Sequence, residues 1–444
     1  MLKRRAFRAP KDFSSTECAL NLMKSLHRDK FMMIPNSKLS GSFFSLQQFS
    51  QQRRNKTIGI DLGSTYTRAM YWQGNDEPPL VIPNILGHEK MRIDGIPSMI
   101  VFHDGKVLSV GGDQICQQPT RLPKITVFEL KRLLGHTYRD LLIQAPHVLL
   151  SNQNQILFIQ GQNGEPLIQI GTCKYSPVEL LSLIFEKVKH NASTFFGEEI
   201  SQAVVAISPY MNDESRAFIS QAGRMCGLNI SRCIYEPHAT ALAFGLHEQL
   251  KPIQTVMVCD FGARSCNISI LEMDEFGLFE LKSTKCNFLC SGLEVDLKIG
   301  EWISNEMKKI GKCTAIPKDR FLMHAEQAKK ELSVKSSTDI KVPILLDDVS
   351  QHDASTEKFT LSLTEMERVI PDFAERAEET IQQCLTDANL HKQSINHVLL
   401  VGGMSKMPLV KRVVSENFGF FTTPPNPQES VVLGCAIQAG RILA

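Results

Sequence analysis

Two stretches of the chain repeat one pattern of apolar and polar positions. In residues 57–70 and again in residues 256–270, an apolar run leads to an Asp, one further residue and a Gly. Polar residues follow, and then a second run that suits a strand. Such a pattern predicts a β-hairpin with glycine at its turn. We therefore expect two similar hairpins, one containing Asp61 and the other Asp260.

Strand-like and helix-like patterns alternate after residue 56, which is typical of an α/β protein and here suggests sheets in two lobes. Strands are predicted at 57–72, 96–102 and 203–207, from 256 onwards, near 339–346 and at 397–401. Helices are predicted at 126–134, 177–196, 214–226, 294–309 and 319–332, with two more within 363–388. Asn212 or Asp213 suits the N-cap of the helix at 214, and Gly227 suits its end.

The two predicted hairpins have the chemistry of a phosphate site. Glycine at a turn lets backbone N–H groups approach an anion closely, and an Asp at a strand end can hold hydrated Mg²⁺. One such turn is usually an ordinary turn, but two copies suggest two related halves around a cleft. A third candidate follows the strand at 397–401, where Gly402 and Gly403 precede a helix start. That turn either presents a helix N-terminus to a ligand or is a tight connection without one.

The bulk composition excludes several classes of protein. The hydrophobic fraction of 43% and the charged fraction of 22% are typical of a globular protein. Residues 57–444 hold 37 basic and 44 acidic residues, so we expect no specific binding of nucleic acid there. The 12 cysteines include no Cys-x-x-Cys pair, so a zinc site is not expected. Their scattered positions are typical of a protein in a reducing compartment. No apolar run is long enough to span a membrane.

Residues 1–56 differ from the rest, with 12 basic and 3 acidic residues. No apolar segment follows the basic start, so a secretory signal is not expected. Three interpretations stay open: a disordered tail, a targeting segment, or an arm that contacts RNA or the ribosome. We expect a cytoplasmic protein, or a mitochondrial one if this segment is a transit peptide.

Three further segments carry a specific resemblance. Residues 127–135, 234–245 and 325–333 resemble the lysine, Glu-Pro and adenosine-binding segments of the heat shock protein 70 chaperones. Together with the glycine turns, they make the chain from 57 to 444 similar to that family's nucleotide-binding domain. The resemblance implies the two-lobed actin-like (ribonuclease H-like) ATPase fold, which is α/β with a central nucleotide cleft. Lobe I would be residues 57–249 plus 421–444, and lobe II residues 250–420.

The resemblance also implies roles for individual residues. Asp61 and Asp260 would hold Mg²⁺ through water, and Glu236 would orient water around the metal. Lys131 would reach the γ-phosphate and the attacking water, where a fixed cation stabilises developing charge. Ser265 stands where the family has a catalytic threonine. The remaining candidates for ATP or ADP are Gly63, Ser64, Thr65 and Tyr66 in the first phosphate loop, Gly262, Ala263 and Arg264 in the second, Gly292, Gly402 and Gly403 at phosphate and ribose, and Glu326, Lys329, Lys330, Ser333 and Lys406 near adenosine.

The second phosphate loop departs from the family pattern. The family has three glycines in a row, whereas here Ala263 and Arg264 follow Gly262, and Asn267 replaces an Asp. Arg264 could sit on the phosphates in place of a monovalent cation, or it could point outward. Near the base, Lys330 and Lys406 replace arginines and lose the flat surface that stacks on a ring.

The expected function is ATP binding with slow hydrolysis, assisting protein folding through partners. The candidate partners are a J-domain protein, a nucleotide exchange factor and the ribosome. We expect no peptide-binding domain, and hence no direct clamp on client peptides. One alternative is a scaffold that binds nucleotide without hydrolysis, or a ribosome-associated co-chaperone. Another is a small-molecule kinase of the same superfamily.

Overall fold

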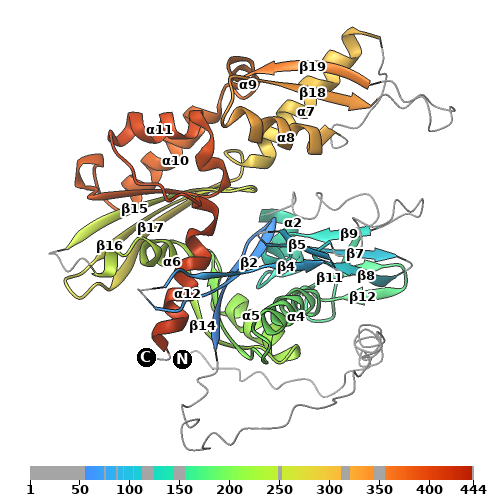
Figure 1. Ribbon diagram of the computed structural model, residues 1–444, viewed down its shortest axis with the longest axis vertical. Coiled ribbons are helices and arrows are strands. Elements are labelled where there is room, and N and C mark those ends of the chain that lie inside the picture. Colours follow the sequence, from blue (N-terminus) through green and yellow to red (C-terminus); the bar gives the residue numbers. More distant parts are fainter. Residues whose placement is uncertain are drawn as a thin grey trace, which may run out of the picture.

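The computed structural model shows a mixed α/β protein with several sheets (Figure 1). It describes residues 56–74, 77–86, 89–93, 95–103, 105–112, 125–144, 156–248, 253–311, 321–343 and 356–442. The predictions for the tail therefore fall almost entirely outside the described residues. No helix in these ranges is long and apolar enough to cross a membrane.

The first large sheet contains the hairpin predicted around Asp61, and that prediction is confirmed. Strands β1 and β2 are antiparallel, while β1 and β13 are parallel, as are β13 and β14. The order is β14-β13-β1-β2-β3, with β6 also paired to β2. The strands are β1 (Thr57–Leu62), β2 (Tyr66–Tyr71), β3 (Leu80–Ile82), β6 (Ile96–Pro97), β13 (Gln202–Ile207) and β14 (Asn229–Tyr235).

Helices cover both faces of this sheet, and alternation along β13 shows how. Val205 and Ile207 belong to the core formed with α4 (Pro177–Phe196) and α5 (Asp213–Met225). Val204 and Ala206 point the other way, toward α6 (Glu236–Ala243) and α12 (Ser430–Ile442). Side chains on a strand alternate between faces, so a strand that is buried throughout needs cover on both sides.

Helix α4 has the bounds that the sequence predicts, and α5 begins within one residue of its prediction. Ser176 caps α4 with a capping box to Glu179, and Gly197 ends it in a left-handed conformation. Asn212 is the N-cap of α5, where its side chain accepts a hydrogen bond from the backbone of Ser215.

The helix predicted at 126–134 is wrong. Residues Ile125–Phe128 form strand β9, which pairs with β7 so that Val127 lies opposite Ile100. Only Leu130–Leu133 are helical, as the short 3₁₀ helix η1. A short apolar run fits either period, and here pairing with β7 decides the outcome.

Smaller sheets and short elements complete the region of the first sheet. Two sheets have three strands, in the orders β8-β7-β9 and β10-β11-β12, and β4 pairs with β5. The remaining elements of this region are β4 (Asn84–Leu86), β5 (Glu89–Ile93), β7 (Met99–His103), β8 (Lys106–Val110), α2 (Tyr138–Gln144), β10 (Leu157–Gln160), β11 (Pro166–Ile170), β12 (Cys173–Tyr175) and η2 (Leu246–Glu248).

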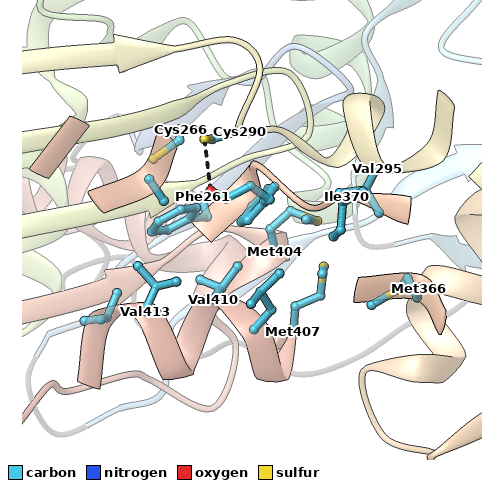
Figure 2. Close-up of a cluster of buried hydrophobic side chains, with 14 of the residues drawn as sticks. Phe261, Cys266, Cys290, Val295, Met366, Ile370, Met404, Met407, Val410 and Val413 are labelled. Atoms are coloured by element: carbon cyan, nitrogen blue, oxygen red, sulfur yellow. Dashed lines mark hydrogen bonds between the residues drawn. The ribbon is translucent and has the colours of Figure 1, made fainter. Parts of the chain in front are cut away.

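The second large sheet contains the other predicted hairpin, which is also confirmed. Strands β15 and β16 are antiparallel and β15 and β20 are parallel, in the order β17-β16-β15-β20. The strands are β15 (Gln254–Phe261), β16 (Cys266–Met273), β17 (Phe279–Asn287) and β20 (His397–Val401). Figure 2 shows Phe261 of β15 above Val410 of α11 (Pro408–Phe418), in a core that also includes α10 (Phe373–Asp387).

Most of the other elements of the second region lie together above this sheet in the view of Figure 1. The helices predicted at 294–309 and 319–332 are observed with shifted starts, and the predicted pair within 363–388 is observed as α9 and α10. Residues 312–320 and 344–355 lie outside the described ranges. The elements are α7 (Gly292–Lys309), α8 (Leu322–Leu332), β18 (Ser337–Pro343), β19 (Thr356–Ser362), α9 (Leu363–Val369), η4 (Lys392–Ser394), η5 (Gly403–Lys406) and η6 (Pro427–Glu429).

Helix α6 lies between the two large sheets. Its Ala239 belongs to the cluster with Val204 and Ala206 of the first sheet. Its Ala241 belongs to the cluster with Val256 and Val258 of the second. The N-terminus of α6, where Glu236 lies, is therefore positioned by both sheets at once.

Candidate functional site

Asp61 and Asp260 occupy equivalent positions at the ends of β1 and β15. In register, Asp61 lies opposite Arg68 and Asp260 opposite Asn267. Burial first, and then the charge of Glu236, raise the pKa of Asp61 to about 6, although Lys131 opposes the shift. For Asp260, burial and the charges of Glu236 and Asp61 raise the pKa to about 7. The carboxyls therefore interact electrostatically, and their negative charge is not fully compensated.

Lys131 and Glu236 form an ion pair within the same group. Lys131 comes from η1 and Glu236 from the first turn of α6, and their side chains are only 12% and 14% exposed. Burial alone would lower the pKa of Lys131, but the charges of Glu236, Asp61 and Asp260 outweigh it and raise the pKa. The structure thus brings together the four residues that the sequence analysis placed at the chemical centre.

The loop after β1 is fixed by a residue that the sequence analysis did not select. Ser98 donates a hydrogen bond to the carbonyl of Gly63 at 2.7 Å, and its backbone N–H donates to Thr65 at 2.8 Å. A Cβ on Gly63 would lie 2.4 Å from the carbonyl oxygen of Tyr66, so the turn requires glycine. The first loop, which also includes Ser64, is therefore held in one shape from outside.

The loop after β15 is a tight turn anchored to α7. The backbone N–H of Gly262 donates to Ser265 at 2.8 Å, which closes the turn. The first N–H groups of α7 donate to this loop, from Gly292 to Gly262 at 3.1 Å and from Leu293 to Ala263 at 2.8 Å. Ala263 therefore fits the turn without opening it.

Asn267 replaces a charge with an amide but keeps a contact to the loop. Its Nδ2 donates to the hydroxyl of Ser265 at 3.2 Å. A small pocket of about 10 Å³ lies beside Asn267, Asp260 and Glu236, which is about the least space that holds one water. The acidic group thus has room for water next to it.

Arg264 does not point outward, because its side chain is only 21% exposed, and its contact with phosphate stays a prediction. Its Nη1 lies 2.9 Å from Oε1 of Glu129, and its guanidinium lies over the ring of Phe128, 5.6 Å from the ring centroid. Arg264 therefore points across to the segment before Lys131. Its partner is far away in sequence, so the contact could not be read from the loop itself.

The third glycine turn contacts the second Asp directly. Gly402 has a φ of 83°, and a Cβ there would lie 2.3 Å from Oδ1 of Asp260. Its N–H donates to the carbonyl of Pro427 at 3.1 Å. Gly403 is exposed, and a Cβ there would have no atom within 4 Å. Gly402 is thus required for the packing of Asp260, and Gly403 is open to the outside.

The sequence of the whole region can also be compared with known protein families. The family model described as Hsp70 protein matches residues 57–444. The chain belongs to the Hsp70 family. Membership implies the actin-like ATPase fold, and Hsp70 proteins are ATP-binding chaperones that bind nucleotide with Mg²⁺. They typically work with J-domain proteins and nucleotide exchange factors.

The Mg²⁺ that the Hsp70 family implies fits the donor set at Asp61 and Asp260. Three carboxylates face one ammonium there, and burial first, then the charge of Glu236, raises the pKa of both aspartates. No group of three or more His, Cys, Asp or Glu side chains within the described ranges could hold a metal ion directly. The arrangement suits a hydrated cation held through water, as the sequence analysis expects.

The residues that the Hsp70 resemblance assigns to adenosine are arranged differently from one another. Lys329 of α8 is buried, and its Nζ donates to Asp296 at 2.6 Å and to the carbonyl of Gly292 at 3.0 Å. Lys330 instead forms an exposed pair with Glu326 at 2.7 Å. The hydroxyl of Ser333 donates to the carbonyl of Lys329. Lys406 lies in η5 and is exposed. Contact of these residues with adenosine stays a prediction.

Four residues of this Hsp70 site were missed by the sequence analysis. Ser98 supports the first loop, and Asp296 pairs with Lys329. Glu129 and Arg132 flank Lys131 closely and reach the second loop. Both are charged residues within the largely apolar run 125–134, and this was the sequence signal that could have indicated them.

Proposed function

We propose that this chain binds Mg²⁺ with ATP or ADP between the loops at Asp61 and Asp260 and hydrolyses ATP slowly. The observation that carries the proposal is the electrostatic grouping of Asp61, Lys131, Glu236 and Asp260. The two aspartates come from two similar hairpins, Glu236 from the helix between the sheets, and Lys131 from η1. Such an arrangement supports phosphoryl transfer, which depends on positioning and on stabilising charge.

Each of these residues has a proposed role. Asp61 and Asp260 hold the metal through water, which at neutral pH requires both carboxyls to be ionised. Lys131 stabilises the charge that develops on the transferred group and positions the attacking water. Glu236 holds Lys131 through the ion pair and orients water beside it. When bound, Mg²⁺ would neutralise charge on the phosphates of ATP.

The remaining candidates surround this centre. We propose that the loop at Gly63, Ser64, Thr65 and Tyr66 contacts the phosphates on one side. The loop from Gly262 to Ser265 contacts them on the other, and Gly402 and Gly403 line the phosphate and ribose. Lys330 and Lys406 are exposed and Glu326 is partly exposed, which supports a role at the base.

A nucleotide-stabilised scaffold without hydrolysis is the second candidate. The observation that favours it is the position of Arg264, whose guanidinium is paired with Glu129. An arginine used in this way does not replace a cation at the phosphates. The second loop would then hold nucleotide with fewer charge contacts than the family's usual loop. Small-molecule kinase activity has no observation of its own in its favour.

Single-turnover hydrolysis distinguishes the two candidates. Excess full-length protein is mixed with labelled ATP and Mg²⁺, and phosphate release is followed beside a Lys131→Ala control. Release that is abolished in Lys131→Ala supports the slow ATPase. Bound ATP that is released intact, with no difference between the two proteins, supports the scaffold. Assistance to folding through a J-domain protein and an exchange factor is proposed from family membership. A cytoplasmic or mitochondrial location is proposed from the sequence alone.

A further inference from the structure

Glu129 is a buried carboxylate shared by two arginines. Oε1 of Glu129 lies 2.9 Å from Nη1 of Arg264, and Oε2 lies 3.5 Å from Nη1 of Arg132. The side chain of Glu129 is only 2% exposed, and those of Arg132 and Arg264 are 18% and 21% exposed. Such a shielded contact is stronger than a surface ion pair.

A further hydrogen bond and two cation–π contacts hold the arginines in place. Nη2 of Arg132 donates to the backbone carbonyl of Arg264 at 3.0 Å. The guanidinium of Arg132 lies 4.4 Å from the ring centroid of Phe288, and that of Arg264 lies over Phe128. Both the side chain and the backbone of Arg264 are therefore tied to the segment around Lys131.

The backbone at Glu129 supports a specific role for this contact. Glu129 has a φ of 61° and a ψ of 28°, the left-handed region that residues with a side chain rarely adopt. Such a conformation persists only where surrounding contacts hold it. Glu129 is the N-cap of η1 and lies two residues before Lys131, so its conformation also sets where η1 begins.

The contact joins the two loops on which the proposed function depends. Glu129 belongs to the segment that presents Lys131, whereas Arg264 follows Asp260 on the second loop. Moving these segments apart would expose a carboxylate and a guanidinium whose mutual attraction stabilises both. Breaking a buried pair on one side is costly, because the other charge is left without compensation.

We propose that Glu129 and Arg264 form a strap that ties the Lys131 segment to the second phosphate loop and slows nucleotide release. The Glu129–Arg264 contact itself does not depend on a bound nucleotide, whereas its effect on nucleotide release rests on the proposed function. Both are positioning residues, since they act through Lys131 and the loop. A protein with this strap holds its nucleotide longer than one with glycine at position 264.

The first test is hydrogen–deuterium exchange of the full chain without nucleotide. Glu129→Gln and Arg264→Ala are compared with Arg412→Ala, which breaks an exposed pair with Glu367 that is also 2.9 Å long. For either strap variant, we expect amide exchange to be about tenfold faster in both 125–134 and 260–267. In the control variant, the exchange rates of these two segments should not change. The double variant should match the single ones. Unchanged exchange at 260–267 in Glu129→Gln, or additive effects in the double variant, overturns the strap.

The second test measures dissociation of fluorescent ADP from the same proteins. We expect about tenfold faster release from Glu129→Gln and Arg264→Ala, with Arg264→Lys between these and the unmodified chain. Equal release rates in all variants overturn the role in nucleotide release. If the unmodified chain binds no ADP, the proposed function fails, and the exchange result still decides the strap. Arg264→Lys keeps the charge and serves where a larger change prevents folding.

Discussion

Lys131 donates a hydrogen bond to the carboxylate of Glu236, which lies 105 residues further along the chain. Both side chains are largely buried, and Asp61 and Asp260 add their charges to the same place. The pair connects η1 with the helix that separates the two large sheets. The proposed nucleotide site depends on the close placement of these four charges.

Removing Lys131 should destabilise the protein as well as stop catalysis. Lys131→Ala leaves Glu236 beside two other carboxyls without its partner, so we expect a loss of about 3 kcal/mol in the free energy of unfolding. Urea denaturation measures it. Lys131→Ala combined with Glu236→Gln should lose less than the sum of the two single variants, because the pair acts as a unit. A strictly additive loss would show that the two residues act independently.

The stability of the nucleotide-free protein should depend on pH in an unusual direction. The pKa of Asp61 rises from 3.8 to about 6 and that of Asp260 to about 7 in the folded state. Between about pH 4 and pH 7 the folded state therefore binds more protons than the unfolded state, and the free energy of unfolding falls as pH rises. Thermal unfolding from pH 5 to pH 8 measures this.

The matched control for the pH experiment replaces both aspartates with asparagine. Asp296 also has a raised pKa of about 6, caused first by burial, and it remains in the variant. In the double variant Asp61→Asn/Asp260→Asn, we expect the melting temperature to depend much less on pH than in the unmodified chain. An equal slope in both proteins would place the titrating groups elsewhere.

The glycine pair at 402–403 offers a comparison of neighbours. Gly402→Ala puts a Cβ 2.3 Å from Oδ1 of Asp260 at a φ of 83°, so Asp260 or the turn must move. We expect a loss of about 1–3 kcal/mol in stability and weaker binding of Mg²⁺ with ADP. Gly403→Ala meets no protein atom within 4 Å and should leave the stability unchanged. Equal behaviour of the two variants in calorimetry would contradict the packing described here.

Replacing either of two adjacent lysines on α8 should also have different effects on stability. Lys329 is buried and paired with Asp296, and Lys329→Ala should cost about 3 kcal/mol of stability. Lys330 is 60% exposed, and Lys330→Ala should cost less than about 1 kcal/mol while weakening nucleotide binding. Urea unfolding and ADP titration of both variants measure the two effects. Strong destabilisation by Lys330→Ala would refute this assignment.

Local signals were sufficient for much of the fold. Ser176 and Glu179 form the capping box that starts α4, and Gly197 ends it, so its bounds could be predicted. The two hairpins could be predicted from repeated Asp-x-Gly turns. Strand β9 could not, because its four residues are also compatible with a helix and only pairing with β7 distinguishes them.

The site could be predicted in its types of residue but less in their partners. Asp61, Lys131, Glu236 and Asp260 carry family motifs, and they do come together. Arg264 has its carboxylate partner at the start of η1, 135 residues earlier in the chain, and no pattern around either residue indicates the pair. Lys329 shows the same limit, since a helix periodicity does not tell which of two neighbouring lysines is buried.

Thermal unfolding with nucleotide tests the central claim most directly. The full chain is heated with ATP or ADP, with and without Mg²⁺, and the double variant Asp61→Asn/Asp260→Asn is treated in the same way. A ligand that binds only the folded state raises the melting temperature by mass action. We predict a rise for the unmodified chain that is largest with Mg²⁺ and much smaller in the variant. The absence of any rise with either nucleotide, with or without Mg²⁺, would contradict the account.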